Sequence, residues 1–240
     1  MRLTDFKVLT FDCYGTLIDW ETGIIEALEP LTSRVSRDLS RDEVLEAHAR
    51  YESMQQLQTP HKKYSELLPV VYRRLSEEWG VEVTWRECLV YGRSVGNWPD
   101  FIDSAGALQY LKRYYKLAIL SNVDNESFSA SAEKLKVNFD ATYTAEDIGS
   151  YKPSDRNFEY MLENLAKLGV QKHEILHVAD SFFHDHWPAN RHGLPSCLIY
   201  RRHDQQGFGA NLSPGGMPSC DFRFNSMAAL VKAHQEDLRS

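Results

Sequence analysis

The sequence predicts an α/β protein, a Rossmann-like three-layer sandwich with a mostly parallel sheet and a helical subdomain inserted after the first strand. Two observations predict this fold class. Short apolar, β-branched runs alternate with longer helical patterns, as in βαβ units whose sheet is covered on both faces. In addition, the first two strands are separated by a helical stretch that is far longer than one crossover needs.

Five segments have the composition of strands, and helical patterns separate them. The expected strands are Lys7–Phe11, Leu117–Leu120, Ala141–Thr144, Ile175–Ala179 and Ser196–Tyr200. The expected helices between and before them are Ala105–Tyr114, Asn125–Leu135, Asp155–Leu168 and Asp185–His192. Near the C-terminus we expect a surface loop, Gln206–Pro218, and a helix, Ser226–Glu236.

The long gap between the first and second strands predicts a separate cap subdomain. Its four expected helices, which carry apolar residues at three- and four-residue spacing, are Thr22–Leu31, Arg41–Gln56, Tyr64–Trp79 and Trp85–Val95. The expected domains are therefore a core of residues 1–19 and 98–240 and a four-helix cap of residues 20–97. A cap inserted there can exclude water from a site at the sheet edge. The alternative is an extension that only stabilises the fold.

Composition excludes several classes of protein. The chain of 240 residues has a formal net charge of −7, which argues against a nucleic-acid partner. No run reaches the roughly 18 apolar residues of a membrane span, and the N-terminal residues do not resemble a signal peptide. We therefore expect a cytoplasmic protein. A disulfide framework or zinc site is not expected, because no CxxC pair occurs among Cys13, Cys88, Cys197 and Cys220.

The first chemical signal is the string from Asp12 to Leu17, which directly follows the expected strand. An aspartate at a strand end can attack an electrophile. Gly15 allows the chain to turn sharply and approach a ligand. The alternative is a turn aspartate that caps a helix, but the whole string favours the nucleophile.

Two weaker signals follow later strands. Ser121 and Asn122 end the second strand, where a hydroxyl and a carboxamide suit anion binding but also start turns. Lys152 is followed by Pro153, which favours the start of a helix. A lysine there can neutralise carboxylates around a nucleophile, although most lysines are simply solvated.

A fourth signal is the string from Asp180 to Asp185, after the strand Ile175–Ala179. Its two acids could hold Mg²⁺ together with Asp12, or could orient a water molecule. The alternative is that Asp180 or Ser181 caps a helix and Asp185 is an acid of its first turn.

Together these strings resemble the haloacid dehalogenase superfamily over nearly the whole chain. The matching features are DxYGTL after the first strand, SN after the second, YKP, the acidic strand end and the helical insertion. Phosphatases of the superfamily carry an aspartate two residues after the nucleophile, as the acid that protonates the leaving alcohol. This chain has Tyr14 there, and a phenol is a poor proton donor at neutral pH.

The resemblance is therefore to the (S)-2-haloacid dehalogenases, whose leaving halide needs no proton. It implies that Asp12 attacks the α-carbon of a short 2-haloalkanoic acid and forms an ester, which water near Asp185 hydrolyses. Lys152 would balance the charge of Asp12, without a cofactor. The substrate-binding residues predicted in this way are Tyr14, Ser121, Asn122, Ser181 and Arg50.

Some positions depart from the dehalogenase pattern. Asp180 and Phe182 stand where those enzymes usually have serine and asparagine, and Phe158 stands where they have tyrosine. The dehalogenase cap also supplies an arginine, for which Arg50 is a candidate and His48 another. The alternative function is a Mg²⁺-dependent phosphatase with Asp12, Asp180 and Asp185 as ligands; a third is a non-catalytic binding protein.

The expected partner is a small-molecule substrate, with no nucleic acid and no membrane, and the resemblance allows a homodimer. Metal binding by His177, His184 and His186 is not expected, because residues two apart on a helix face different directions. Trp20 and Trp98 are expected to pack near the two connections between cap and core.

Overall fold

The computed structural model describes residues 1–213 and 215–239. It contains a six-stranded sheet of order β3-β2-β1-β4-β5-β6, in which every pairing is parallel. Its strands are β1 (Val8–Phe11), β2 (Lys116–Ser121), β3 (Ala141–Thr144), β4 (Ile175–Ala179), β5 (Ser196–Ile199) and β6 (Phe222–Phe224). The five expected strands are confirmed with small shifts at their ends. The sequence analysis misses β6, because three residues are too few to show a periodic pattern.

Ten α-helices accompany the sheet in the described part of the chain. Those between β1 and β2 are α1 (Trp20–Thr32), α2 (Arg41–Gln58), α3 (Tyr64–Glu78), α4 (Trp85–Gly92) and α5 (Ser104–Leu111). The others are α6 (Asn125–Leu135), α7 (Ala145–Ile148), α8 (Asp155–Lys167), α9 (Trp187–Arg191) and α10 (Met227–Asp237). Short 3-10 turns are η1 (Leu3–Asp5), η2 (Ser94–Asn97) and η3 (Lys172–Glu174).

The helix expected over 185–192 differs from the structure. A π-helical turn, η4 (Phe182–His186), precedes α9. The Ser181 hydroxyl accepts a hydrogen bond from the backbone N–H of His184 at 3.1 Å and so caps this turn. The turn therefore begins three residues earlier than expected, and it carries Asp185 into the buried interior.

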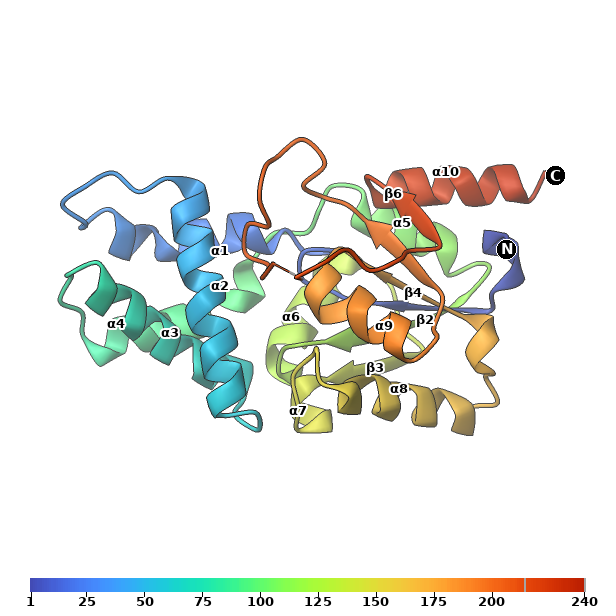
Figure 1. Cartoon of the computed structure of the whole chain (residues 1–240), viewed down its shortest axis with the longest axis horizontal. Coiled ribbons are helices and arrows are strands. Elements are labelled where there is room, and N and C mark those ends of the chain that lie inside the picture. Colours follow the sequence, from blue (N-terminus) through green and yellow to red (C-terminus); the bar gives the residue numbers. More distant parts are fainter. Residues whose placement is uncertain (214, 240) are drawn as a thin grey trace.

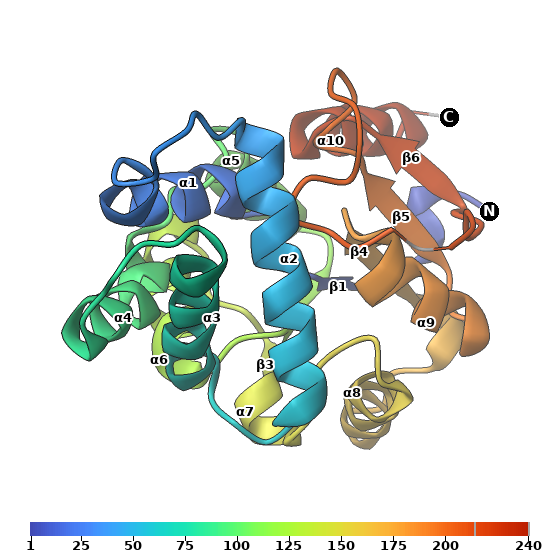
Figure 2. The same ribbon diagram turned by 60° about the vertical axis from the view of Figure 1, so that its left-hand side comes forward.

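Alternation along the strands produces three layers. Leu9 and Phe11 belong to the apolar cluster shared with α5, α6 and α10, whereas Val8 belongs to the cluster shared with α8 and α9. Successive side chains of a strand point to opposite faces, so a strand buried on both sides is apolar throughout. Figure 2 shows α8 and α9 on one side of the sheet and α5 and α10 on the other.

The order in which strands are added to the sheet changes direction at β1, in the middle of the sheet. From β1 the strands continue outward through β2 and β3 on one side and through β4, β5 and β6 on the other. Ligands of such sheets bind outside the carboxyl ends of the strands at this switch point. Asp12 is the first residue after β1 and therefore lies there.

The helices α1 to α4 gather on one side of the molecule, apart from the sheet (Figure 1). Local capping sets where they begin: the Ser40 hydroxyl accepts the N–H of Glu43 at 3.2 Å, and the Glu43 carboxylate accepts the N–H of Ser40 at 2.8 Å. Asp124, the N-cap of α6, also accepts the N–H of Ser65 in α3 at 2.7 Å, which links this helical group to the sheet layers. Taking residues 20–97 as a cap domain remains our proposal.

In the described part of the chain, no helix is both long enough and apolar enough to cross a membrane.

Candidate active site

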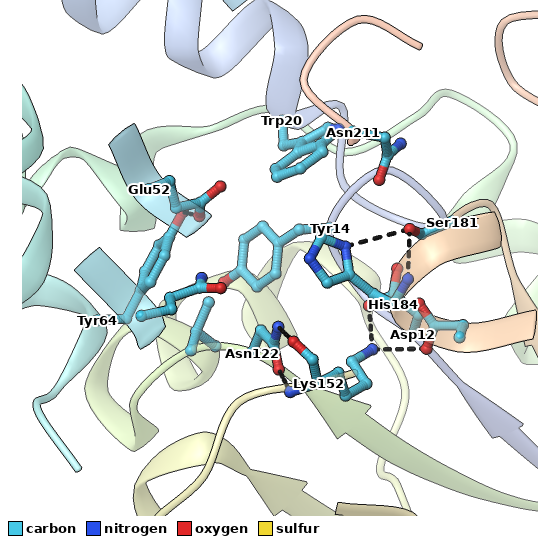
Figure 3. Close-up of a pocket in the computed structure, with 13 residues that line it drawn as sticks. Asp12, Tyr14, Trp20, Glu52, Tyr64, Asn122, Lys152, Ser181, His184 and Asn211 are labelled. Carbon is cyan, nitrogen blue, oxygen red and sulfur yellow. Dashed lines mark hydrogen bonds and ion pairs between the residues drawn. The ribbon is translucent and has the colours of Figure 1, made fainter. Parts of the chain in front are cut away.

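A narrow cavity lies between the carboxyl edge of the sheet and the helices α2 and α3. It is lined by Asp12, Tyr14, Trp20, Glu52, Gln56, Tyr64, Asn122, Val123, Lys152, Ser181, His184, Asp185 and Asn211. Figure 3 shows these side chains converging from segments far apart in the sequence. All three predicted catalytic residues are among them.

Asp12 is held by one neighbour on each of its carboxylate oxygens. Its side chain is buried, and Oδ1 accepts a hydrogen bond from the Lys152 ammonium group at 2.8 Å. The hydroxyl of Thr16, one turn later in the same string, donates to Oδ2 at 2.8 Å. Gly15 has a φ of 94°, a backbone conformation that is strained for residues with a side chain. Glycine at this position therefore lets the string from Asp12 to Leu17 fold back on itself.

Lys152 is buried between the two acids that the sequence analysis grouped with it. Its ammonium group donates to Asp12 Oδ1, to Asp185 Oδ1 at 2.7 Å and to the backbone carbonyl of Leu120 at 2.9 Å. Asn122 fixes the lysine backbone from both sides: its amide donates to the Lys152 carbonyl at 3.0 Å, and its Oδ1 accepts the Lys152 N–H at 2.7 Å. The predicted anion-binding carboxamide therefore positions the lysine in this structure.

Asp185 has a second partner, which the sequence analysis did not assign to the site. His177 Nε2 lies 2.9 Å from Asp185 Oδ1, and His177 Nδ1 lies 2.9 Å from the hydroxyl of Thr10. The other oxygen of Asp185, Oδ2, is buried and has no hydrogen-bond partner among the described residues. A buried carboxylate oxygen without a partner is costly, and it is suited to bind a water molecule at the cavity wall.

The two acids differ in basicity, although they share the lysine. Burial raises the pKa of Asp12, and the Lys152 ammonium group only partly offsets this rise. Burial acts in the same direction on Asp185, but Lys152 and His177 together hold its pKa below the usual range. Since a more basic carboxylate is the better nucleophile, this difference favours Asp12 for attack and Asp185 as a permanently charged partner.

Tyr14 lines the cavity with its ring and not with its hydroxyl. The hydroxyl lies 2.8 Å from the Ser131 hydroxyl and donates to the Ser127 carbonyl at 3.3 Å, both in α6. Burial raises the pKa of Tyr14 well above its ordinary value. The group two residues after Asp12 is therefore neither directed at the cavity nor acidic enough to protonate a leaving group.

We expect the substitution Tyr14→Phe to leave kcat within about threefold of the wild-type value, because it removes only a hydroxyl that is bonded to α6. An acid at this position would contribute about 10²- to 10⁴-fold. Steady-state turnover of the two proteins at pH 7 tests this. A loss in the larger range would assign Tyr14 to proton transfer.

Asp180 is turned away from the other two acids. Its Oδ1 accepts the N–H of Arg201 at 3.0 Å, and its Oδ2 accepts the amide of Asn211 at 3.2 Å. Within residues 1–213 and 215–239, no group of three or more His, Cys, Asp or Glu side chains is arranged to hold a metal ion. Asp12, Asp180 and Asp185 thus do not form a three-carboxylate set, and Lys152 takes the position between Asp12 and Asp185.

Burial raises the pKa of Asp180 to about 7. The folded state therefore keeps a proton that an unfolded aspartate loses near pH 4, so this group makes the fold less stable as the pH rises from about 4 to 7. We expect Asp180→Asn to remove this loss while its Oδ1 still accepts from Arg201. The difference in melting temperature between Asp180→Asn and the wild type should be at least about 3 °C larger, in favour of the variant, at pH 8 than at pH 5. An equal difference at both pH values would contradict this.

The remaining predicted binding residues are placed differently. Ser121 is buried and is not part of the lining, and its hydroxyl has no hydrogen-bond partner among the described residues. Ser181 lines the cavity, and its hydroxyl lies 3.2 Å from His184 Nδ1. Arg50 is not part of the lining: its guanidinium group bonds to Glu78 at 2.6 Å on the outer surface of the helical group. His48 is buried in α2 and is not part of the lining either.

Two departures from the dehalogenase pattern have packing roles. Phe158 is fully buried, and its ring meets that of His177 edge-on, with the centroids 5.2 Å apart. The ring of Phe182 lies 6.4 Å from that of Tyr200, away from the cavity. Phe158 thus supports the histidine that holds Asp185.

Several cavity residues were missed by sequence reasoning. Glu52, Gln56 and Tyr64 follow an ordinary helical pattern, and Asn211 lies in a segment that was expected to be a surface loop. Trp20, expected only to pack, also lines the cavity. The helical pattern in the sequence indicates which face of a helix is buried, but it does not distinguish a residue in the core from a residue that lines a cavity.

Comparison with known proteins gives the family. The model of the haloacid dehalogenase-like hydrolases matches residues 6–193. The (S)-2-haloacid dehalogenase 4A of Burkholderia cepacia is 26% identical over 201 residues, which cover 82% of this chain and 84% of that protein.

Solved structures show the same fold. The L-2-haloacid dehalogenase from Xanthobacter autotrophicus superposes with a TM-score of 0.77 at 20% identity, covering 96% of this chain and 98% of that one. The putative HAD-hydrolase YfnB from Bacillus subtilis, bound to magnesium, superposes with a TM-score of 0.73 at 17% identity, covering 98% and 100%. The chain therefore belongs to the haloacid dehalogenase-like hydrolase family.

Proposed function

We propose that this hydrolase is a dehalogenase acting on a short 2-haloalkanoic acid through an ester at Asp12. The observation that carries the proposal is the direction of Tyr14, whose hydroxyl is bonded to α6. The side chain of Tyr14, which stands where an acid would protonate a leaving alcohol, therefore cannot donate a proton there. Halide leaves as a stable anion and needs no proton, so the site favours this leaving group over an alkoxide.

In the first step Asp12 attacks the α-carbon, the carbon–halogen bond breaks with its electron pair on the halide, and an ester forms. Lys152 keeps the carboxylate ionised and in place. The relative from Burkholderia cepacia supports this substrate class by its name.

In the second step water attacks the carbonyl carbon of the Asp12 ester and releases a 2-hydroxy acid. The free oxygen of Asp185 orients this water, and His177 holds the carboxylate from the other side. One proton of the water leaves with the product hydroxyl and the other goes to solvent, which regenerates the Asp12 carboxylate.

Single turnover in H₂¹⁸O tests the mechanism. If the ester forms, ¹⁸O appears in the Asp12 carboxyl group, where mass spectrometry of the peptide detects it. If water attacks the α-carbon directly, ¹⁸O appears in the product hydroxyl instead, and the proposal fails.

Chloride and phosphate release decide the reaction class. We expect chloride release from one enantiomer of 2-chloropropionate, unchanged by EDTA. Phosphate release from p-nitrophenyl phosphate that requires Mg²⁺, without any chloride release, would replace the proposal by the phosphatase function.

A further inference from the structure

The end of the cavity formed by α2 and α3 carries an acid that the proposed reaction does not use. Glu52 and Gln56 lie one turn apart on α2, and Tyr64 begins α3. Both Glu52 and Tyr64 are buried, and the Tyr64 hydroxyl donates to Glu52 Oε1 at 2.6 Å. Figure 3 places Glu52 and Asp12 at opposite ends of the cavity, with the ring of Tyr14 between them.

The second oxygen of Glu52 accepts no hydrogen bond from any residue that the structure describes. Within residues 1–213 and 215–239, the nearest basic group is His48 Nδ1, at 4.0 Å from Oε2, which is beyond hydrogen-bond distance. Both ring nitrogens of His48 are themselves buried without a partner. One face of the Glu52 carboxylate is therefore available to a ligand in the cavity that it lines.

The charge of the cavity favours a cation at that end. Among the described lining residues Lys152 is the one permanent cation, and it is already bonded to two carboxylates. Burial lowers the pKa of His184 to about 4, so this ring is neutral at pH 7. Since no arginine among the described residues lines the cavity, an anionic substrate group next to Glu52 would have no compensating cation. Burial raises the pKa of Glu52 to about 7, and an ammonium group beside it would favour the ionised form.

The walls near Glu52 also suit an ammonium group. The rings of Trp20, Tyr14 and Tyr64 line the same cavity, and aromatic faces attract cations. The side-chain amide of Gln56 offers a further acceptor. A primary ammonium group has three donors for these partners.

We propose that Glu52 is the specificity-determining residue of the cavity, and that it selects substrates with an ammonium group at the end remote from the carbon attacked by Asp12. This inference rests on the proposed function, which places the carbon that is attacked next to Asp12. The substrate class is then a short 2-haloalkanoic acid with an amino substituent.

Binding of halogen-free isosteres tests the inference without turnover. Each ω-amino acid is compared by calorimetry with the alkanoate of the same length: β-alanine with butanoate, 4-aminobutanoate with pentanoate, and 5-aminopentanoate with hexanoate. At the length that spans the cavity we expect the amino acid to bind at least about tenfold more tightly. Equal or tighter binding of the alkanoate at every length, or binding of neither, would overturn the inference.

Variants then assign the preference to one side chain. We expect Glu52→Gln to abolish it, since glutamine keeps the shape and removes the charge. Glu46→Gln, an exposed position on the same helix, serves as the matched control and should retain it. A preference that survives Glu52→Gln in a folded protein would contradict the role of Glu52, and the wild-type comparison stands even if that variant fails to fold.

Turnover separates this inference from the proposed function. Halide release from the 2-chloro derivative of the ω-amino acid with the preferred length is compared with that from the 2-chloroalkanoate of the same length, and we expect at least about a tenfold higher kcat/KM for the first. Release from both at equal rates would overturn the ammonium preference and leave the dehalogenase intact. Release from neither, with the binding preference present, would instead reject the dehalogenase.

Discussion

The substitution Asp12→Asn is expected to lower kcat by at least about 10⁴-fold, a loss typical of enzymes that lose a covalent nucleophile. The amide is nearly isosteric, and its oxygen can still accept the hydrogen bond from Thr16 or from Lys152. It is far less nucleophilic than a carboxylate, so the ester cannot form at a useful rate. Halide release under saturating substrate measures the loss.

Asp19→Asn provides the matched control. Asp19 is the N-cap of α1, and its side chain accepts the N–H of Thr22 at 3.2 Å. Asparagine caps helices as well as aspartate does, so this variant should keep both stability and activity. Activity of Asp12→Asn within tenfold of wild type would contradict the assignment of the nucleophile.

Lys152→Met is expected to impair both activity and stability. Removing the ammonium group leaves Asp12 and Asp185 buried side by side without a cation, and breaking a buried ion pair typically costs about 3–5 kcal/mol. Burial already raises the pKa of Asp12, and the loss of Lys152 raises it further. The carboxylate is then protonated over a wider pH range, and kcat/KM at pH 7 should fall by at least about 10²-fold.

The pH dependence of kcat/KM tests whether the loss of activity in Lys152→Met comes from protonation of Asp12. A protonated Asp12 cannot attack, so the acid limb of the rate profile should move to higher pH in Lys152→Met. The variant should also lose stability relative to wild type as the pH rises from 5 to 8, because deprotonation of Asp12 places a buried charge next to Asp185 without the Lys152 cation. Thermal melting across this range tests the sign. Lys232→Met, on the exposed side of α10, should change neither quantity. An unshifted acid limb would show that Lys152 does not control the charge of Asp12.

The sequence by itself determined the fold class and predicted which charged residues meet at the carboxyl edge of the sheet. Apolar runs that alternate with helical patterns require a parallel sheet, and the carboxyl ends of parallel strands meet at one edge. Asp12, Ser121 and Asp185 follow three such strands, so their proximity could be predicted without knowing any side-chain direction. Lys152 belonged to a recognisable string next to the same edge.

Only the tertiary structure decided which way individual side chains point. The string that contains Tyr14 does not reveal that its hydroxyl bonds to α6, and the helical pattern around Arg50 does not reveal that its guanidinium group bonds to Glu78 outside the cavity. Glu52 and Asn211 reach the cavity because the inserted helices and the C-terminal segment pack over the sheet edge. Such contacts join residues far apart in the chain, and the local periodicity that predicts helices and strands carries no information about them.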